Sequence, residues 1–162
     1  MRLAALVTAI VFLLDQASKY AVVHLMDLAS RREIDVLPPF LNFRMAWNQG
    51  VNFGLLSGDT QLTRWILILL SLAISVWVWT WARKEAHKPL IQVSVGLLVG
   101  GALGNVIDRL MYGAVADFLN MSCCGIENPF AFNVADITIF AGAIGLVLFS
   151  GGKAAPKGGK NS

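Results

Sequence analysis

Four long apolar stretches dominate this chain, at residues 3–26, 62–82, 90–107 and 134–149. A helix needs about 20 apolar residues to cross the hydrocarbon core of a bilayer, and it satisfies its own backbone hydrogen bonds there. Each stretch is near that length, the fourth being the shortest. The sequence therefore predicts an all-α membrane protein with four transmembrane helices.

The composition agrees with a membrane protein. Hydrophobic residues make up 56% of the chain and charged residues 14%, whereas about 25% of a soluble domain is charged. The net charge of +3 gives no indication of a nucleic-acid partner. Arg2 before the first stretch resembles the start of a signal peptide, but Asp15 and Lys19 occupy the region where a small-residue cleavage site would stand. We therefore expect an uncleaved helix.

The charges also predict an orientation. One side of the membrane would hold most of the excess basic residues: Arg2, Arg83, Lys84, Lys88, Lys153, Lys157 and Lys160. Because such residues stay in the cytoplasm, we expect both termini inside and the loops 27–61 and 108–133 outside. Residues 1–150 would form one membrane-embedded domain. The Gly- and Lys-rich tail, 151–162, is expected to be a disordered cytoplasmic segment near the anionic membrane surface.

The outer segment 40–58 has a different pattern. Leu41, Phe43, Met45 and Trp47 alternate with polar or small residues, and glycines follow. Alternation with a period of two predicts strands and a turn. We expect a small extracytoplasmic β element on the outer leaflet, with its aromatic residues at the level of the headgroups.

Two ionisable residues interrupt the first apolar stretch. Asp15 and Lys19 are four residues apart, so they lie on one face of a helix and can pair. Charged side chains at membrane depth cost on the order of 2.5–3.5 kcal/mol each on insertion scales, and they are usually paired or functional. The pair is either an internal ion pair that fixes helix packing or a direct participant in substrate handling.

The third apolar stretch combines small and polar residues. Gly96, Gly100 and Gly104 repeat every four positions, which predicts close packing against a neighbouring helix. Asn105 and Arg109, with Asp108 between them, then lie at the predicted outer end of this helix. Taken alone, they could be a helix end that reaches into water.

Two further aspartates favour a catalytic function. Asp117 lies just beyond the third stretch and Asp136 at the start of the fourth, both in apolar surroundings. A single aspartate at a helix start is most often a cap. Two at one depth, close to Asn105, Asn133 and Arg109, suit chemistry better. Two carboxyls that share a proton can activate water and polarise an amide carbonyl, so the pair predicts peptide hydrolysis without a metal or organic cofactor.

Other catalytic chemistries fit less well. The two histidines, His24 and His87, are predicted on opposite membrane faces, and no H-E-x-x-H or G-x-S-x-G motif occurs. A small proton- or cation-coupled transporter is the main alternative, because intramembrane acids often carry ions. However, the charged residues gather at one face. A packing or assembly protein is a third possibility, but it gives no reason for the aspartates and asparagines to gather.

Five ordered motifs resemble those of a known family. They are Asp15-Gln16-x-x-Lys19, Asn48-x-Gly50-x-x-Phe53-Gly54, Gly100-Gly101-Ala102-x-Gly104-Asn105-x-x-Asp108-Arg109, Val115-x-Asp117-Phe118 and Phe132-Asn133-x-Ala135-Asp136. Over residues 3–150 the chain is similar to lipoprotein signal peptidase, also called signal peptidase II. Asn52 stands where a small residue is expected in this family, and Cys123 and Cys124 belong to none of the five motifs.

The resemblance implies an aspartyl endopeptidase of the bacterial cytoplasmic membrane, with Asp117 and Asp136 as its catalytic pair. It would remove signal peptides from prolipoproteins by cleaving before a diacylglyceryl-modified cysteine, near the outer membrane face. The resemblance also implies a small outer β-cradle, a short mobile outer helix over the site, and no metal or cofactor. We expect the chain to be a monomer. Eight residues match motif positions that support the site or contact substrate: Asp15, Lys19, Asn48, Gly50, Asn105, Arg109, Asn133 and Ala135.

Overall fold

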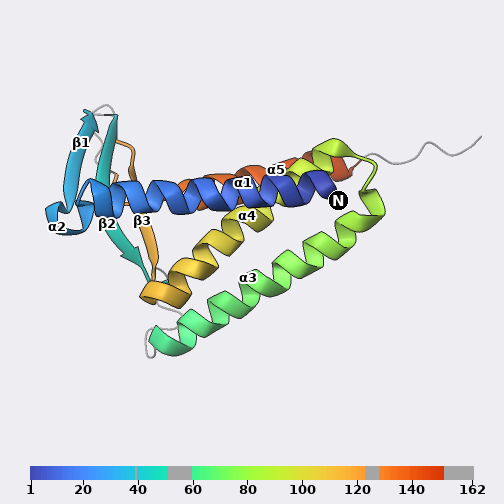
Figure 1. Ribbon diagram of the computed structural model, residues 1–162, viewed down its shortest axis with the longest axis horizontal. Coiled ribbons are helices and arrows are strands. Elements are labelled where there is room, and N and C mark those ends of the chain that lie inside the picture. The colour runs from blue at the N-terminus through green and yellow to red at the C-terminus, as the bar shows by residue number, and fades with distance from the viewer. Residues whose placement is uncertain (39, 51–59, 123–127, 152–162) are drawn as a thin grey trace, which may run out of the picture.

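The computed structural model describes residues 1–38, 40–50, 60–122 and 128–151 (Figure 1). The predictions for Asn52, for the cysteine pair and for the tail beyond residue 151 lie outside these ranges. The described elements are α1 (Arg2–Lys19), the π-helix η1 (Tyr20–Leu25), α2 (Leu28–Arg31), β1 (Glu33–Leu37), β2 (Leu41–Asn48), α3 (Thr60–Ala82), the 3-10 helix η2 (Arg83–Glu85), α4 (Pro89–Tyr112), β3 (Val115–Asn120) and α5 (Val134–Ser150).

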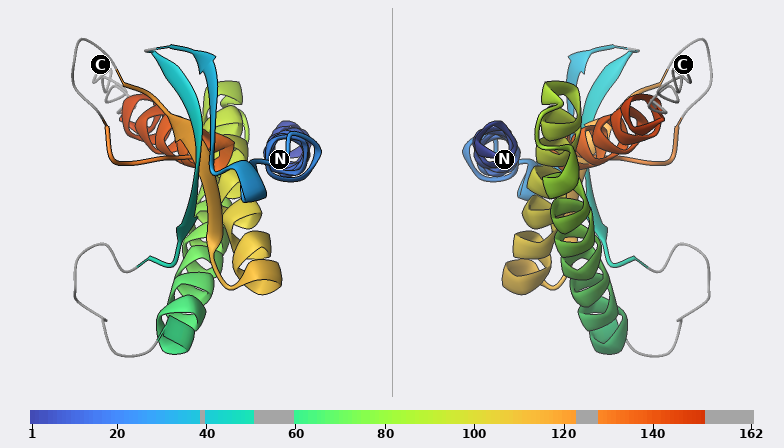
Figure 2. Two further views of the ribbon diagram at one scale, coloured as in Figure 1. Left: turned by 90° about the vertical axis from the view of Figure 1, so that its left-hand side faces the viewer. Right: turned by 90° about the vertical axis from the view of Figure 1, so that its right-hand side faces the viewer.

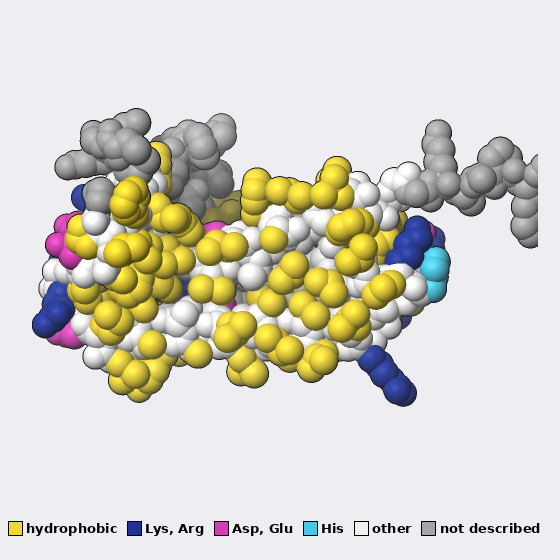
Figure 3. Space-filling view, turned by 90° about the horizontal axis from the view of Figure 1, so that it is seen from above, with side chains coloured by type: hydrophobic (Ala, Val, Ile, Leu, Met, Phe, Trp, Pro, Cys, Tyr) yellow, Lys and Arg dark blue, Asp and Glu magenta, His cyan; other side chains and the backbone are white. Residues whose placement is uncertain are grey.

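The chain is a mostly helical membrane protein. Within the described residues, three helical segments are long and apolar enough to cross a bilayer: Arg2–Leu25, Gln61–Glu85 and Pro89–Tyr112. The fourth predicted span, α5, is apolar but has only 17 residues. Apolar side chains cover the sides of the helices, while charged groups gather at the two ends of the molecule (Figure 3). That distribution is the one a lipid environment requires.

The helix α4 lies at the centre of the bundle, with α1 and α5 on opposite sides of it (Figure 2). The predicted close packing of its glycines is confirmed, and the neighbour is α1 of the same chain. A Cβ atom on Gly96 or Gly100 would lie within 3 Å of side-chain or backbone atoms of α1. Small residues therefore let the two backbones approach closely.

One helix end differs from its predicted position. The third apolar helix continues to Tyr112 instead of ending at residue 107, so Asp108 and Arg109 lie inside it. It ends at Gly113, which adopts a left-handed conformation with φ +79°. At the sheet end of α1, the short helix α2 follows after Asp27.

A three-stranded antiparallel sheet, in the order β1-β2-β3, lies at one end of the helices (Figure 1). Pairing of Glu33 with Arg44 fixes β1 against β2, and pairing of Asn48 with Val115 fixes β2 against β3. The prediction of strands in 40–58 is correct for β2, but β1 and β3 lie outside that segment. β3 was missed because it is buried on both faces and lacks polar–apolar alternation.

A small apolar core attaches the sheet to the helices. Phe118 of β3 is almost completely buried, with Val22 of η1 and Leu28 of α2. Its ring meets that of Phe43 edge-on at 5.7 Å between centroids. This packing fixes the position of β3, and therefore of the neighbouring Asp117, relative to η1 and α2.

Candidate active site

The structure brings Asp117 and Asp136 together at the sheet end of the bundle through a shared neighbour, Asn133. Asn133 is the N-cap of α5 and is completely buried. Its Oδ1 accepts from Asp136 N at 2.9 Å, and its backbone N–H donates to Asp136 Oδ2 at 3.2 Å. Its Nδ2 donates to Asp117 Oδ1 at 2.7 Å. A capping box therefore doubles as the link between a strand aspartate and a helix aspartate.

The second oxygen of Asp117 is held from β2. Asn48 Nδ2 donates to Asp117 Oδ2 at 3.0 Å, and Asn48 Oδ1 accepts from Gly50 N at 2.8 Å. Gly50 has φ +81°, and a Cβ atom there would collide with the Leu67 side chain of α3. The glycine therefore permits a turn that fixes which end of the Asn48 amide faces the carboxyl.

Asp136 receives its other hydrogen bond from α4. Asn105 Nδ2 donates to Asp136 Oδ1 at 3.0 Å. Asn105 Oδ1 accepts from Lys19 Nζ and from Asn133 Nδ2, each at 3.3 Å. Because both donors face the amide oxygen, the amide nitrogen is directed at Asp136.

Arg109 adds a positive charge beside the pair. Its Nη1 donates to the Asn105 carbonyl at 3.3 Å, and its guanidinium is within electrostatic range of both Asp117 and Asp136. A cation in this position can stabilise negative charge that develops on a substrate oxygen.

The two carboxyls differ in environment. Asp117 is 2% exposed, whereas Asp136 is half-buried. Burial, followed by the nearby Asp136 carboxyl, raises the pKa of Asp117 to about 7, against the opposing effects of Asn48, Lys19 and Asn133. Asp117 can therefore hold a proton near neutral pH, as an acid catalyst must.

An ion cluster lies behind this pair. Lys19 Nζ is 2.8 Å from Asp15 Oδ2 and 2.7 Å from Asp108 Oδ2. The predicted pairing of Asp15 with Lys19 is confirmed. Gln16 Nε2 bridges the two acids, at 3.2 Å from Asp15 and 3.1 Å from Asp108. All three charged side chains are at most 7% exposed, which is affordable in a membrane protein because they neutralise one another in part.

The cluster also holds the backbone next to Asp117 and next to Asp136. Asp15 Oδ1 accepts from Ala135 N at 2.9 Å, and Asp108 Oδ2 accepts from Ala116 N at 3.1 Å. Ala135 precedes Asp136 and Ala116 precedes Asp117. The cluster therefore positions both β3 and the start of α5.

Sequence reasoning omitted Gln16 and Asp108 from the site. Both stand in the quoted motifs, but Asp108 was predicted at the outer end of the third helix, where it could have reached into water. It is instead 1% exposed inside α4. The eight residues predicted to support the site or contact substrate all lie within or beside this network. In the part of the chain that the structure describes, no three His, Cys, Asp or Glu side chains are grouped as metal ligands.

Comparisons with known proteins identify the family. A family model described as signal peptidase (SPase) II matches residues 7–151. The chain belongs to this family. A lipoprotein signal peptidase of Methylorubrum extorquens (strain PA1) is 43% identical over 137 residues, which is 85% of this chain and 78% of that protein. One from Methylobacterium sp. (strain 4-46) is 39% identical over 140 residues, covering 86% of this chain and 83% of its own length.

Solved structures agree with the fold. Two structures described as bacterial membrane enzymes superpose with TM-scores of 0.78 and 0.74, at 29% and 28% identity. The first covers 93% of this chain and 94% of its own, and the second covers 95% and 94%. The similarity therefore includes both the bundle and the sheet.

Proposed function

We propose that Asp117 and Asp136 form the catalytic pair with which this signal peptidase II hydrolyses lipoprotein precursors. Removal of the signal peptide from prolipoproteins is the activity of the family, and the rival transporter function has no support from it. The observation that carries the assignment is the pair of carboxyls joined through Asn133, one buried and one half-buried. Different environments suit an acid and a base.

The different surroundings of the two carboxyls assign the roles of acid and base in peptide hydrolysis. The Asp136 carboxylate takes a proton from a water molecule as the water oxygen attacks the scissile carbonyl carbon. Protonated Asp117 donates its proton to the carbonyl oxygen, which gives a neutral tetrahedral diol. As the C–N bond breaks, Asp136 passes its proton to the leaving nitrogen, and Asp117 recovers one from a hydroxyl of the diol. Both carboxyls then return to their starting states.

The supporting residues hold this arrangement. Asn48 and Asn133 fix the two oxygens of Asp117, and Asn105 fixes one of Asp136. The guanidinium of Arg109 would stabilise charge on the substrate carbonyl. Preorganised donors of this kind avoid reorganisation during the reaction.

We assign the sheet end to the outer face of the membrane. Arg83, Lys84 and Lys88 lie at the turn between α3 and α4, at the opposite end of the bundle from the sheet. Basic residues are retained on the cytoplasmic side. With α5 as the fourth crossing, the start of α1 and the end of α5 would both be cytoplasmic. The chain would act as a monomer.

The substrate in this proposal is a precursor with a diacylglyceryl cysteine just after the scissile bond. Its signal helix would approach sideways through the bilayer, and its acyl chains would remain in lipid. The dyad then meets the peptide bond at the membrane surface, where water is available for hydrolysis.

A gel-shift cleavage assay tests the proposal. Purified protein in detergent would be mixed with a prolipoprotein that does or does not carry the diacylglyceryl group. We expect cleavage of the lipidated form alone, lost in Asp117→Asn and in Asp136→Asn but retained in Asp35→Asn, whose side chain is exposed on β1. Normal cleavage by either dyad variant would refute the catalytic assignment. A folded wild-type protein that cleaves neither form would refute the substrate assignment.

A further inference from the structure

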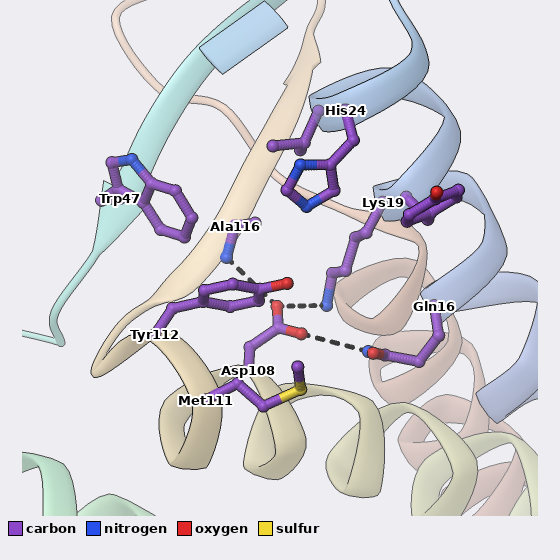
Figure 4. Close-up of a pocket in the computed structure, with 10 residues that line it drawn as sticks. Gln16, Lys19, His24, Trp47, Asp108, Met111, Tyr112 and Ala116 are labelled. Atoms are coloured by element: carbon purple, nitrogen blue, oxygen red, sulfur yellow. Dashed lines mark hydrogen bonds and ion pairs between the residues drawn. The ribbon is translucent and has the colours of Figure 1, made fainter. Parts of the chain in front are cut away.

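A separate cavity lies between α1, α4 and the sheet (Figure 4). It has a volume of about 260 Å³. Its lining includes Gln16, Lys19, Trp47, Asp108, Tyr112 and Ala116. Neither dyad aspartate is among the described residues that line it. Successive strand side chains point to opposite faces, so Ala116 faces this cavity and Asp117 faces the proposed peptidase site.

A second, apolar groove lies along α1 and α4. It has a volume of about 430 Å³, and its lining includes Phe12, Trp79, Leu103 and Ile107. Phe12 is about one helical turn below Gln16 on α1, and Ile107 is about one turn below Met111, which lines the cavity on α4. The charged and polar side chains of the cavity are therefore followed, about one helical turn away, by the apolar lining of the groove. A lipid molecule likewise has a polar headgroup followed by apolar acyl chains.

The charge beside the cavity favours a cation. The network described above contains four aspartates and two basic side chains, Lys19 and Arg109. With Asp117 protonated, it has one negative charge in excess. Asp108 and Lys19 of this network both line the cavity, where they pair with each other at 2.7 Å. The excess negative charge of the network as a whole is costly in a low-dielectric region, and a cation bound beside the network would stabilise it.

Aromatic rings supply a surface for an ammonium group. The ring centroids of Trp47 and Tyr112 are 5.5 Å apart with an interplanar angle of 50°. Such rings attract alkylammonium groups through their negative faces. Gln16 Nε2 donates to Asp108, whereas within the described residues Gln16 Oε1 accepts no hydrogen bond. That oxygen is available to an N–H donor in the cavity.

We propose that this cavity binds the primary ammonium headgroup of an ethanolamine phospholipid from the adjacent leaflet, with one acyl chain in the apolar groove. Gln16 Oε1 would accept from the ammonium, and Trp47 and Tyr112 would pack against its methylene groups. A glycerol phospholipid lacks the ammonium group and has a net negative charge, which the excess negative charge of the network would disfavour. The site differs from that of the peptide substrate because it opens on the other face of β3.

Native mass spectrometry of the purified protein would test the site. Dioleoyl phosphatidylethanolamine and dioleoyl phosphatidylglycerol would be added at equal concentration, since they differ only in headgroup. We expect the ethanolamine lipid to bind at least about threefold more tightly, as one cation–π contact provides. The Tyr112→Leu variant should lose that preference. Trp77→Leu, on a lipid-facing side of α3 where Trp77 is 68% exposed, should keep it.

Each other outcome overturns a part of the proposal. Equal binding of the two lipids, or tighter binding of the glycerol lipid, would refute the ammonium site. An unchanged preference in Tyr112→Leu would refute its location. Displacement of the ethanolamine lipid by a diacylglyceryl-cysteine peptide would show that the groove takes the substrate's own lipid instead. The assay reads lipid binding alone, so a failure here leaves the peptidase assignment intact.

Discussion

Replacing Asp117 by Asn should change how the stability of this protein depends on pH. In the folded protein the pKa of Asp117 is about 7, whereas its ordinary value is 3.8. Below 3.8 the carboxyl is protonated in both the folded and the unfolded chain. Between 3.8 and 7 the unfolded chain releases the proton and the folded chain keeps it, so rising pH favours unfolding. Above 7 the full loss of stability is reached.

The stability lost when Asp117 ionises follows from the interval between its two pKa values. At 1.36 kcal/mol per pH unit, it corresponds to about 4 kcal/mol. The Asp117→Asn variant cannot ionise at this position, so it does not lose this stability at high pH. Its side-chain amide, however, cannot accept hydrogen bonds from both Asn48 and Asn133. That mismatch costs about 1–3 kcal/mol at every pH. The variant should therefore be less stable than wild type at pH 4 and gain about 4 kcal/mol relative to it by pH 8.

Thermal unfolding in detergent would measure the difference. At about 2–4 °C per kcal/mol for a chain of this size, the Tm of the variant relative to wild type should rise by about 8–16 °C between pH 4 and pH 8. Asp35→Asn, on the exposed face of β1, controls for the loss of a carboxyl. A constant Tm difference between Asp117→Asn and wild type across this range would refute the buried, protonated state of Asp117.

Three further perturbations test the network around the pair. Lys19→Met leaves two buried carboxylates without their cation and should cost about 3–5 kcal/mol in detergent melts, whereas Lys88→Met, at a half-exposed ion pair between neighbouring turns, should leave the Tm unchanged. Gly104→Ala places a Cβ against the Asp15 carboxylate and should cost about 1–3 kcal/mol, while Gly151→Ala meets no atom within 4 Å and should be neutral in the same melts. Cleavage should decline above about pH 7 as Asp117 loses its proton. Asn48→Leu removes a hydrogen bond that lowers the pKa of Asp117, so in a pH–rate profile the decline should begin about one pH unit higher.

Local patterns were sufficient to predict several features of the structure. The spacing of Asp15 and Lys19 gave their ion pair, because residues four apart share a helix face. The repeat at Gly96, Gly100 and Gly104 gave the close helix contact for the same reason. Both patterns depend only on helical geometry, which the sequence specifies through its apolar stretches.

Features that depend on distant parts of the chain were harder to predict. β3 has no alternation, because the side chains on both of its faces are buried. Asp108 was assigned to a helix end, since nothing local indicates that Lys19, 89 residues away in sequence, neutralises it. The meeting of Asp117 and Asp136 was proposed from their common depth and from family motifs. Their link through Asn133 required tertiary structure to see.

The ion cluster has a consequence for how this chain enters the bilayer during synthesis. The first helix is made before α4 exists, so Asp15 and Lys19 must be inserted without Asp108. Because the two charges are one turn apart, α1 carries its own counter-ion and enters as a nearly neutral segment. Asp108 arrives later and joins a lysine that is already in place. The ion cluster would therefore assemble in two steps, first as α1 inserts with Asp15 and Lys19 and then as α4 inserts with Asp108. Each step leaves few unpaired charges in lipid.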